Sequence, residues 1–174
     1  MRTHKLLIVF VCMLVGLMMA TCCLGSVFVS SILFTHRGVA RTTPQPVSPY
    51  IAIARQAAID AGIPPDLFVR QINRESGFDP HALSPAGAQG IAQFMPKTAA
   101  SLGIDPWNPV AALKGAAHLM AHYTNMFDGT YAKALATYNA GPGAVQHALK
   151  VCGNAHWMNC LPAETQQYIT AILG

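Results

Sequence analysis

Hydrophobic positions follow two different patterns, one in the first 34 residues and another in the rest of the chain. From Leu6 to Phe34 the sequence contains no charged residue, proline, asparagine or glutamine. As a helix that rises about 1.5 Å per residue, such a stretch is long enough to cross a hydrocarbon layer about 30 Å thick. The pattern therefore predicts an N-terminal transmembrane helix in residues 1–34, followed by a proline-containing linker over residues 35–49.

Two other interpretations of the N-terminal segment stay open. A cleaved signal peptide has an apolar core of about 7–15 residues, about half the length found here, but Gly38-Val39-Ala40 resembles a cleavage site. A lipoprotein signal ending at Cys22 is a weaker match, because apolar sequence continues well past that cysteine. We favour an uncleaved anchor.

Residues 50–174 show no alternating strand pattern of useful length, but they contain frequent helix start and stop signals. Asn108-Pro109 is the strongest of these, because asparagine caps helix N-termini and proline fits the first helical position. The sequence predicts an all-α domain with a short helical piece inside the glycine-rich stretch after Ser84. The other predicted helices run from Ser48-Pro49 to Gly62, from Pro65 to Gly77, from Pro96 to Leu102, from Asn108-Pro109 to Phe127, from Thr130 to Gly141, from Gly143 to Val151 and from Pro162 onward.

Charge is distributed as unevenly as hydrophobicity. The chain carries 11 basic and 7 acidic residues, yet residues 50–174 sum to zero because four basic residues and no acid precede them. A neutral domain argues against binding nucleic acid through charge. His118 and His122 have a spacing that can bind zinc, but no glutamate lies beside His118 as the metalloprotease motif requires. We therefore predict neither a metal nor a cofactor.

The chain has only two glutamates, Glu75 and Glu164. At about 100° per residue, Glu75 shares an apolar helix face with Phe68 and Ile72, while Arg74 projects from the opposite face. Partial burial and the nearby helix C-terminus both raise the pKa of such a carboxyl, which can then act as a general acid. On helical placement alone, a solvated glutamate at a helix end is the simpler interpretation.

Cys152 and Cys160 lie eight positions apart in the predicted domain. A disulfide between them would stabilise the fold by about 2–3 kcal/mol in the chain-entropy treatment. It would also place the domain in an oxidising compartment, outside the cytoplasm. Two unpaired thiols are the alternative.

Four segments in residues 50–174 carry ordered motifs that together resemble the soluble-lytic-transglycosylase (SLT) domain of the lysozyme-like family 23 glycoside hydrolases. They read ESGFDP over residues 75–80, SPAGAQGIAQFMPKTA over 84–99, ATYNAGPG over 136–143 and PAETQQY over 162–168. The sequence departs from the family at Ile91-Ala92, where many members have Leu-Met, and at Asp79, where asparagine is common. The segment with the two cysteines is not assigned by the resemblance.

The resemblance implies a lysozyme-like fold and cleavage of the β-1,4 bond between N-acetylmuramic acid and N-acetylglucosamine in peptidoglycan. Glu75 corresponds to the single catalytic glutamate of the family. It would protonate the leaving oxygen, the substrate's N-acetyl carbonyl would attack C1, and the C6 hydroxyl would close a 1,6-anhydro ring without water. The enzyme would thus be a carbohydrate-active lyase. Asp79 has a simpler role as the turn residue before a proline.

The same motifs identify candidate substrate-binding residues, each with a simpler structural alternative. Gln93 has the donor and acceptor that suit an acetamido group, but isolated glutamines more often lie on surfaces. By the resemblance, Tyr138 orients the catalytic glutamate or the N-acetyl group. The full set of candidates is Ser76, Gln93, Met95, Tyr138, Asn139, Glu164 and Tyr168.

Two other functions stay open: a lysozyme-type hydrolase of the same bond, and a non-catalytic wall-binding or assembly module. The predicted partners are peptidoglycan glycan strands, the membrane through residues 6–34, and an envelope-spanning secretion, conjugation or phage apparatus. The catalytic domain, residues 50–174, is expected on the extracytoplasmic side of the membrane.

Overall fold

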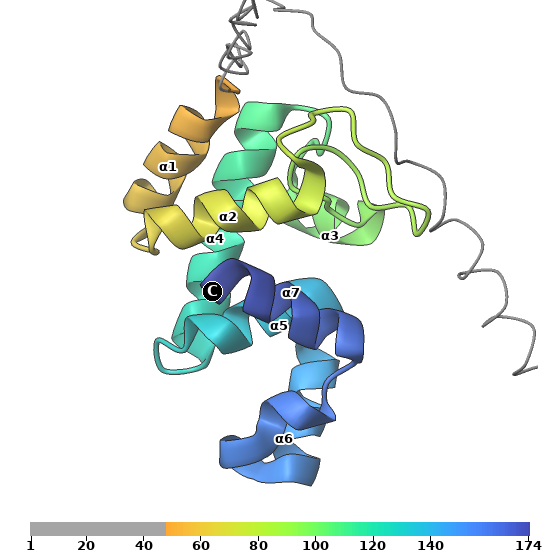
Figure 1. Cartoon of the computed structure of the whole chain (residues 1–174). Coiled ribbons are helices and arrows are strands. Elements are labelled where there is room, and N and C mark those ends of the chain that lie inside the picture. Colours follow the sequence, from red (N-terminus) through yellow and green to blue (C-terminus); the bar gives the residue numbers. More distant parts are fainter. Residues whose placement is uncertain (1–47) are drawn as a thin grey trace, which may run out of the picture. The chain divides into compact units, whose positions relative to one another are not determined.

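The computed structural model describes residues 48–174, which form an all-α domain (Figure 1). Its elements are α1 (Tyr50–Ala61), α2 (Pro65–Ser76), α3 (Pro96–Leu102), α4 (Pro109–Met126), α5 (Tyr131–Ala140), α6 (Pro142–His156), the 3-10 helix η1 (Trp157–Cys160) and α7 (Ala163–Leu173). The predicted anchor lies outside the described part, as does the predicted linker except for its last two residues, 48 and 49. Among the described helices, none combines the length and apolar character that a membrane crossing needs.

Proline and glycine set most helix boundaries, as the sequence predicts. Proline occupies the first turn of α2, α3, α4 and α6, where its missing N–H costs no hydrogen bond. The Asn108 side chain accepts a hydrogen bond from the backbone N–H of Ala111 at 3.1 Å and so caps α4. Gly62 and Gly77 adopt left-handed conformations that end α1 and α2.

The prediction of a short helical piece after Ser84 is wrong, because residues 84–95 form an irregular loop instead. Gly87, Gly90 and Gln93 all have positive φ, which a right-handed helix excludes. The loop pairs with itself through isolated antiparallel bridges, in which the backbones of Gln89 and Phe94 exchange hydrogen bonds of 2.9 and 3.0 Å.

The core lies between α4, which packs against α1 and α5, and α2, which packs against α1 and α7. In Figure 1, α7 runs beside α5 and lies below α2. The buried residues of α1 are all alanines, and three of the five buried residues of α4 are alanines as well. The largest fully buried apolar side chains are Phe68, Ile72, Ile91, Leu113, Met120, Leu135, Val145, Ile169 and Ile172.

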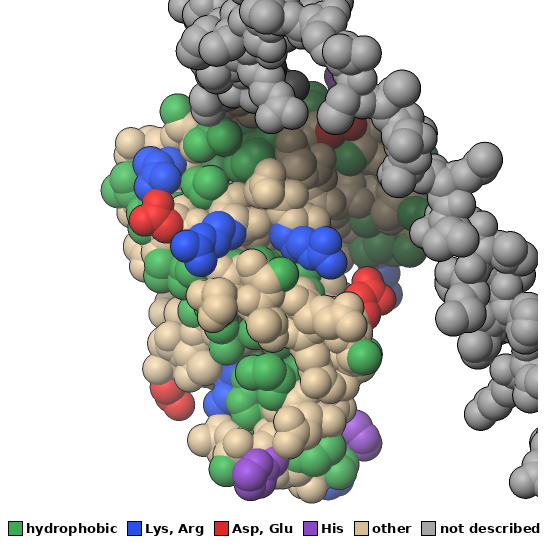
Figure 2. All heavy atoms as spheres, in the orientation of Figure 1, with side chains coloured by type: hydrophobic (Ala, Val, Ile, Leu, Met, Phe, Trp, Pro, Cys, Tyr) green, Lys and Arg blue, Asp and Glu red, His purple; other side chains and the backbone are tan. Residues whose placement is uncertain are grey.

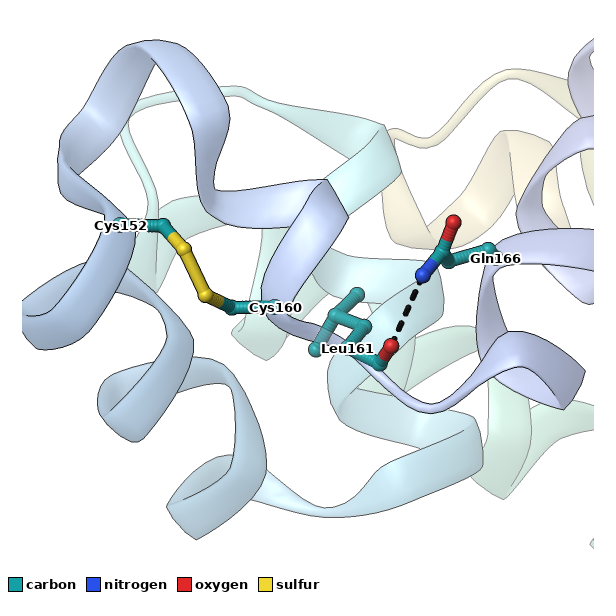
Figure 3. Close-up of a disulfide and its surroundings, with 4 residues drawn as sticks. All are labelled: Cys152, Cys160, Leu161 and Gln166. Carbon is teal, nitrogen blue, oxygen red and sulfur yellow. Dashed lines mark hydrogen bonds between the residues drawn. A yellow bond between two sulfur atoms is a disulfide. The ribbon is translucent and has the colours of Figure 1, made fainter.

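The far end of α6 is closed by a disulfide between Cys152 and Cys160, the pairing that the sequence left open (Figure 3). Helix α6 extends beyond the predicted end at Val151, with a kink at Gly153 where φ is 67°. After η1, the Gln166 side chain donates to the Leu161 carbonyl at 2.8 Å and fixes the entry into α7.

Charged side chains of both signs lie dispersed on the face of the domain shown in Figure 2, without a patch of one sign. One exposed ion pair joins α1 to α2, with Arg55 Nη1 lying 2.7 Å from Asp66 Oδ1. An exposed pair of this kind contributes about 1 kcal/mol or less to the free energy of unfolding. The helices are therefore held together by apolar packing.

Candidate active site

Glu75 lies in the last turn of α2, where the chain turns at Gly77 into the irregular loop. Phe68 and Ile72, on the same face of the helix, are fully buried. The Glu75 side chain itself is only partly buried, and it opens onto a cleft. Arg74 beside it is exposed. The carboxyl group thus lies at the border between the apolar interior and the surface, as the helical pattern predicts.

Burial raises the pKa of Glu75 to about 7, because the carboxylate loses hydration. Two groups oppose this rise: the hydroxyl of Tyr168, which donates a hydrogen bond to Glu75 Oε1, and the positive charge of Arg74. A carboxyl with a pKa near 7 populates both protonation states at neutral pH. It can therefore donate a proton and later accept one.

The cleft has a volume of about 440 Å³ and is formed by the end of α2, the loop, the end of α5 and the start of α7. It brings together residues from all four sequence motifs. Besides Glu75, it is lined by Arg74, Ser84, Ala86, Ala88, Gln93, Met95, Tyr138, Asn139, Glu164 and Tyr168. Every predicted substrate-binding residue except Ser76 lies in this set.

Ser76 and Gln93 hold the loop in place. The Ser76 hydroxyl donates to the backbone carbonyl of Ile91 at 2.7 Å. The Gln93 side chain donates from Nε2 to the carbonyls of Gly90 at 2.9 Å and Ala82 at 3.2 Å. Both side chains therefore shape the wall of the cleft next to Glu75.

The two motif tyrosines have different partners. The hydroxyl of Tyr138 donates to the backbone carbonyl of Ala92 at 2.7 Å, which ties α5 to the loop. The hydroxyl of Tyr168, from α7, donates to the carboxyl of Glu75. The structure thus places Tyr168, rather than Tyr138, in the position of a glutamate-orienting group.

The remaining candidates, Asn139, Glu164 and Met95, also line the cleft. Asn139 Oδ1 accepts a hydrogen bond from the hydroxyl of Thr165 at 2.8 Å, which joins the end of α5 to the first turn of α7. Glu164 is exposed in that same turn. Met95 offers an apolar surface, 45% exposed, at the start of α3.

Two contributors to the site were missed by the sequence reasoning. Thr165 is buried and holds Asn139, and its spacing from Tyr168, Ile169 and Ile172 marks the buried face of α7. Gln71 is fully buried one helical turn before Glu75. The helical period would have placed it on the apolar face with Phe68 and Ile72.

Asp79 contributes a turn rather than a second carboxylate facing Glu75. Its Oδ1 accepts a hydrogen bond from the backbone N–H of His81 at 2.8 Å, and its side chain is exposed. Asp79 is absent from the lining of the cleft, where Glu164 is the other acidic side chain.

His118 and His122 lie on α4 beside an apolar hollow lined by Leu102, Ile104 and Leu119. Within residues 48–174, no cluster of three or more histidine, cysteine or acidic side chains has the geometry to hold a metal ion.

The family model described as Transglycosylase SLT domain matches residues 52–157, more than half of the chain. The chain belongs to this family. The matched segment of the SLT domain contains Glu75, the loop and Tyr138. It ends before Glu164 and Tyr168, which α7 adds to the cleft.

Curated relatives share the SLT segment but are much longer than this chain. The membrane-bound lytic murein transglycosylase D of Escherichia coli K12 is 36% identical over 112 residues, which cover 58% of this chain and 25% of the relative. The peptidoglycan transglycosylase gp16 of Escherichia phage T7 is 36% identical over 104 residues, or 55% of this chain and 8% of gp16. The SLT segment thus corresponds to a quarter or less of these two relatives.

Solved structures show the same SLT fold. An inactive glutamate-to-glutamine mutant of the lytic transglycosylase Slt from Pseudomonas aeruginosa is 26% identical with a TM-score of 0.62, covering 72% of this chain and 23% of that one. The 70 kDa soluble lytic transglycosylase of E. coli is 24% identical with a TM-score of 0.64, covering 71% and 23%. The all-α, lysozyme-like SLT prediction is therefore confirmed for the described domain.

Proposed function

We propose that the domain is a peptidoglycan lytic transglycosylase that cleaves the β-1,4 bond between N-acetylmuramic acid and N-acetylglucosamine. The observation that carries this proposal is the environment of Glu75. It is a single partly buried carboxyl with a pKa raised to about 7, held by one tyrosine hydroxyl at the side of a cleft. Membership of the SLT family supplies the substrate class.

In this mechanism Glu75 moves one proton in each of two steps. Protonated Glu75 first donates its proton to the leaving glycosidic oxygen, while the substrate's own N-acetyl oxygen forms a bond to C1. The resulting carboxylate then takes the proton of the C6 hydroxyl, whose oxygen attacks C1 and releases the N-acetyl oxygen. The product is a 1,6-anhydro ring, and no water is consumed. A pKa near 7 suits both steps.

The cleft offers groups that fit an N-acetylated sugar. The NH₂ group of Gln93 is used within the loop, so its carbonyl oxygen is the group that can accept an acetamido N–H. Met95 provides an apolar surface for a sugar face. Glu164 and Asn139 provide polar atoms at the mouth of the cleft.

The surroundings of Glu75 favour a substrate-assisted reaction over hydrolysis with two enzyme carboxylates. Asp79 is bonded within its turn, and Glu164 is exposed in the first turn of a different helix. Neither has the burial that distinguishes Glu75. This contrast makes the hydrolase the second candidate.

Mass analysis of the muropeptides released from purified peptidoglycan tests the proposal. Wild-type protein should release products with anhydro ends, which are lighter by one water than reducing ends. Glu75→Gln should lower the rate by about 10³-fold, within the range for loss of a general acid–base group. Asp60→Asn, which removes an exposed carboxylate from α1, is the control and should leave the rate unchanged.

Each alternative has its own outcome in this assay. Reducing ends alone would establish the hydrolase. Wall binding without cleavage by the wild-type protein would establish the assembly module. Full activity of Glu75→Gln would exclude the mechanism written here.

We further propose that the domain works on the extracytoplasmic side of a membrane, anchored through residues 6–34. The apolar composition of that segment and the disulfide at Cys152 and Cys160 support this. Transglycosylases D and C among the relatives are named as membrane-bound. Protease treatment of intact spheroplasts should degrade the domain while its membrane fraction still retains the N-terminal segment; protection from protease would contradict the proposed side.

A further inference from the structure

Gln71 is a fully buried polar side chain one helical turn before Glu75 on α2. A buried amide is costly unless it forms hydrogen bonds. Its Oε1 accepts a hydrogen bond of 3.4 Å from the hydroxyl of Tyr131 on α5. Its Nε2 has no hydrogen-bond partner among residues 48–174. The domain therefore buries a hydrogen-bond donor, the Nε2 group of Gln71, whose burial is not explained by apolar packing.

The Tyr168 hydroxyl is an acceptor on this part of α2, because it is bonded to Glu75, four residues after Gln71 on the same helix. The Gln71 side chain lowers the pKa of the Tyr168 hydroxyl, the effect that a donor facing the phenol oxygen has, against a larger rise caused by burial. The Tyr168 hydroxyl uses its own proton to donate to Glu75. Its oxygen is thus free to accept from the amide.

We propose that Gln71 is a positioning residue: its amide donates to the Tyr168 oxygen and thereby directs the Tyr168 proton at Glu75. The inference rests on the proposed acid–base role of Glu75. The groups then form one directed chain from Tyr131 through Gln71 and Tyr168 to the carboxyl. Every donor in it points toward Glu75, and the links come from α5, α2 and α7.

The direction of this chain has an electrostatic consequence. A phenol that accepts a hydrogen bond becomes a stronger donor, and a stronger donor favours the carboxylate over the acid. Gln71 therefore holds the pKa of Glu75 below the value that burial alone would give. The other groups that face Glu75 are Arg74, which acts in the same direction, and Tyr138, whose own titration is pushed far upward.

Carboxyl ¹³C NMR of protein labelled at glutamate Cδ gives a direct test, since the whole chain contains only two glutamates. A Glu164→Gln sample assigns the signal of Glu75, whose titration midpoint should lie near pH 7. Gln71→Met keeps the size and removes the donor, and it should raise the midpoint by about 0.3–0.5. Tyr168→Phe removes the direct hydrogen bond and should raise it by about 1 or more.

The double variant Gln71→Met/Tyr168→Phe decides whether Gln71 acts through Tyr168. The titration midpoint of Glu75 should then equal that in Tyr168→Phe alone, because without the Tyr168 hydroxyl the Gln71 amide has no group through which to affect Glu75. Additive rises, or a midpoint unchanged by Gln71→Met in a folded protein, would overturn the proposal. If Gln71→Met unfolds, Tyr131→Phe tests the same chain and should give a smaller rise in the same direction; an unchanged midpoint there would also overturn it.

The titration is measured without substrate, so its outcome is separate from that of the proposed function. A wild-type protein that released no anhydro ends would refute the transglycosylase even if the midpoints shifted as expected. In an active enzyme, the alkaline limb of the kcat profile should move to higher pH in Gln71→Met, whereas a purely structural effect would lower kcat equally at all pH values.

Discussion

The irregular loop over residues 77–95 and the kinked helical segment over residues 152–160 are held by different forces. Hydrogen bonds from Ser76, Gln93 and Tyr138 fix the loop to the helices around it. A disulfide connects the end of α6 to η1 (Figure 3). One region forms a wall of the cleft, and the other contributes no residue to the cleft lining.

The difference has a consequence for how the molecule responds to substitution. Side chains that anchor the loop also line the cleft or adjoin Glu75, so a change there should alter activity and stability together. The disulfide-linked segment over residues 152–160 does not line the cleft. A change there should alter stability alone.

Gly90→Ala should be the most damaging single change in the loop. Gly90 has φ of +70°, and an added Cβ would overlap the backbone carbonyl oxygen of Pro106. Backbone must move to relieve such an overlap, so we expect a loss of about 3 kcal/mol or more in the free energy of unfolding, with activity lost as well. Urea denaturation and muropeptide release measure the two effects.

Gly87→Ala is the matched control, because Gly87 has φ of +89° but no atom within 4 Å of the added Cβ. It should lose only about 1–2 kcal/mol, the cost of the left-handed backbone. Equal losses in the two variants would show that the close approach of Pro106 is unimportant.

Replacing both Cys152 and Cys160 by alanine should have the next largest effect on stability. The disulfide closes a loop with a sequence separation of 8, for which chain entropy gives about 2–3 kcal/mol. Activity measured well below the unfolding temperature should be unchanged. Reductant should destabilise the wild type to the level of the variant and leave the variant unaffected; a fall in activity of the folded variant would contradict the separation of the two regions.

The sequence allowed most helix boundaries to be predicted, because proline, asparagine and glycine act within a few residues of where they stand. The loop could not be predicted in the same way. Its path depends on the positive φ of Gln93, which is not a glycine, and on a hydrogen bond between Ser76 and Ile91 that spans 15 residues. Local propensity contains no information on such a contact.

The candidate site shows the same limit. Motifs identified both tyrosines, yet only the packing of α7 against α2 shows that Tyr168 reaches Glu75, while Tyr138 bonds to Ala92. The burial of Glu75 followed from its apolar helix face. The proposed role of Gln71 did not, because its bonded partner Tyr131 comes from α5 and its proposed acceptor Tyr168 from α7.

Glu75→Gln should stabilise the domain at alkaline pH, in contrast to the disulfide variant. The pKa of Glu75 rises from 4.5 to about 7 on folding, so the folded state favours the neutral acid. This stability is fully present below pH 4.5 and is lost as the pH rises through 7. With allowance for partial exposure, the free energy of unfolding of Glu75→Gln should therefore exceed that of the wild type by about 1–3 kcal/mol at pH 8. At pH 4 the two proteins should have equal free energies of unfolding.

Denaturation curves of both proteins between pH 4 and pH 8 measure this difference. The variant without the disulfide should retain the pH dependence of the wild type, because the titrating group lies in the cleft. Parallel stability profiles for Glu75→Gln and wild type would mean that Glu75 is not desolvated in solution.

Ser76→Ala should give the smallest of these effects. It tests most directly whether a side chain that anchors the loop affects both stability and activity. The variant loses the hydrogen bond from the Ser76 hydroxyl to Ile91, worth about 1 kcal/mol in the free energy of unfolding. Because Ile91 lies in the loop whose Gln93 and Met95 line the cleft, we also expect kcat/KM to fall by about 5-fold, which corresponds to a similar free energy.

Ser101→Ala is a matched control for this last change. The Ser101 hydroxyl also donates to a backbone carbonyl, that of Thr98 at 2.8 Å, but it lies exposed on α3 and outside the cleft lining. It should lose at most a few tenths of a kcal/mol, as exposed substitutions usually do, and no activity. A loss of stability without loss of activity in Ser76→Ala would place that serine with the disulfide, among the purely structural supports of the domain.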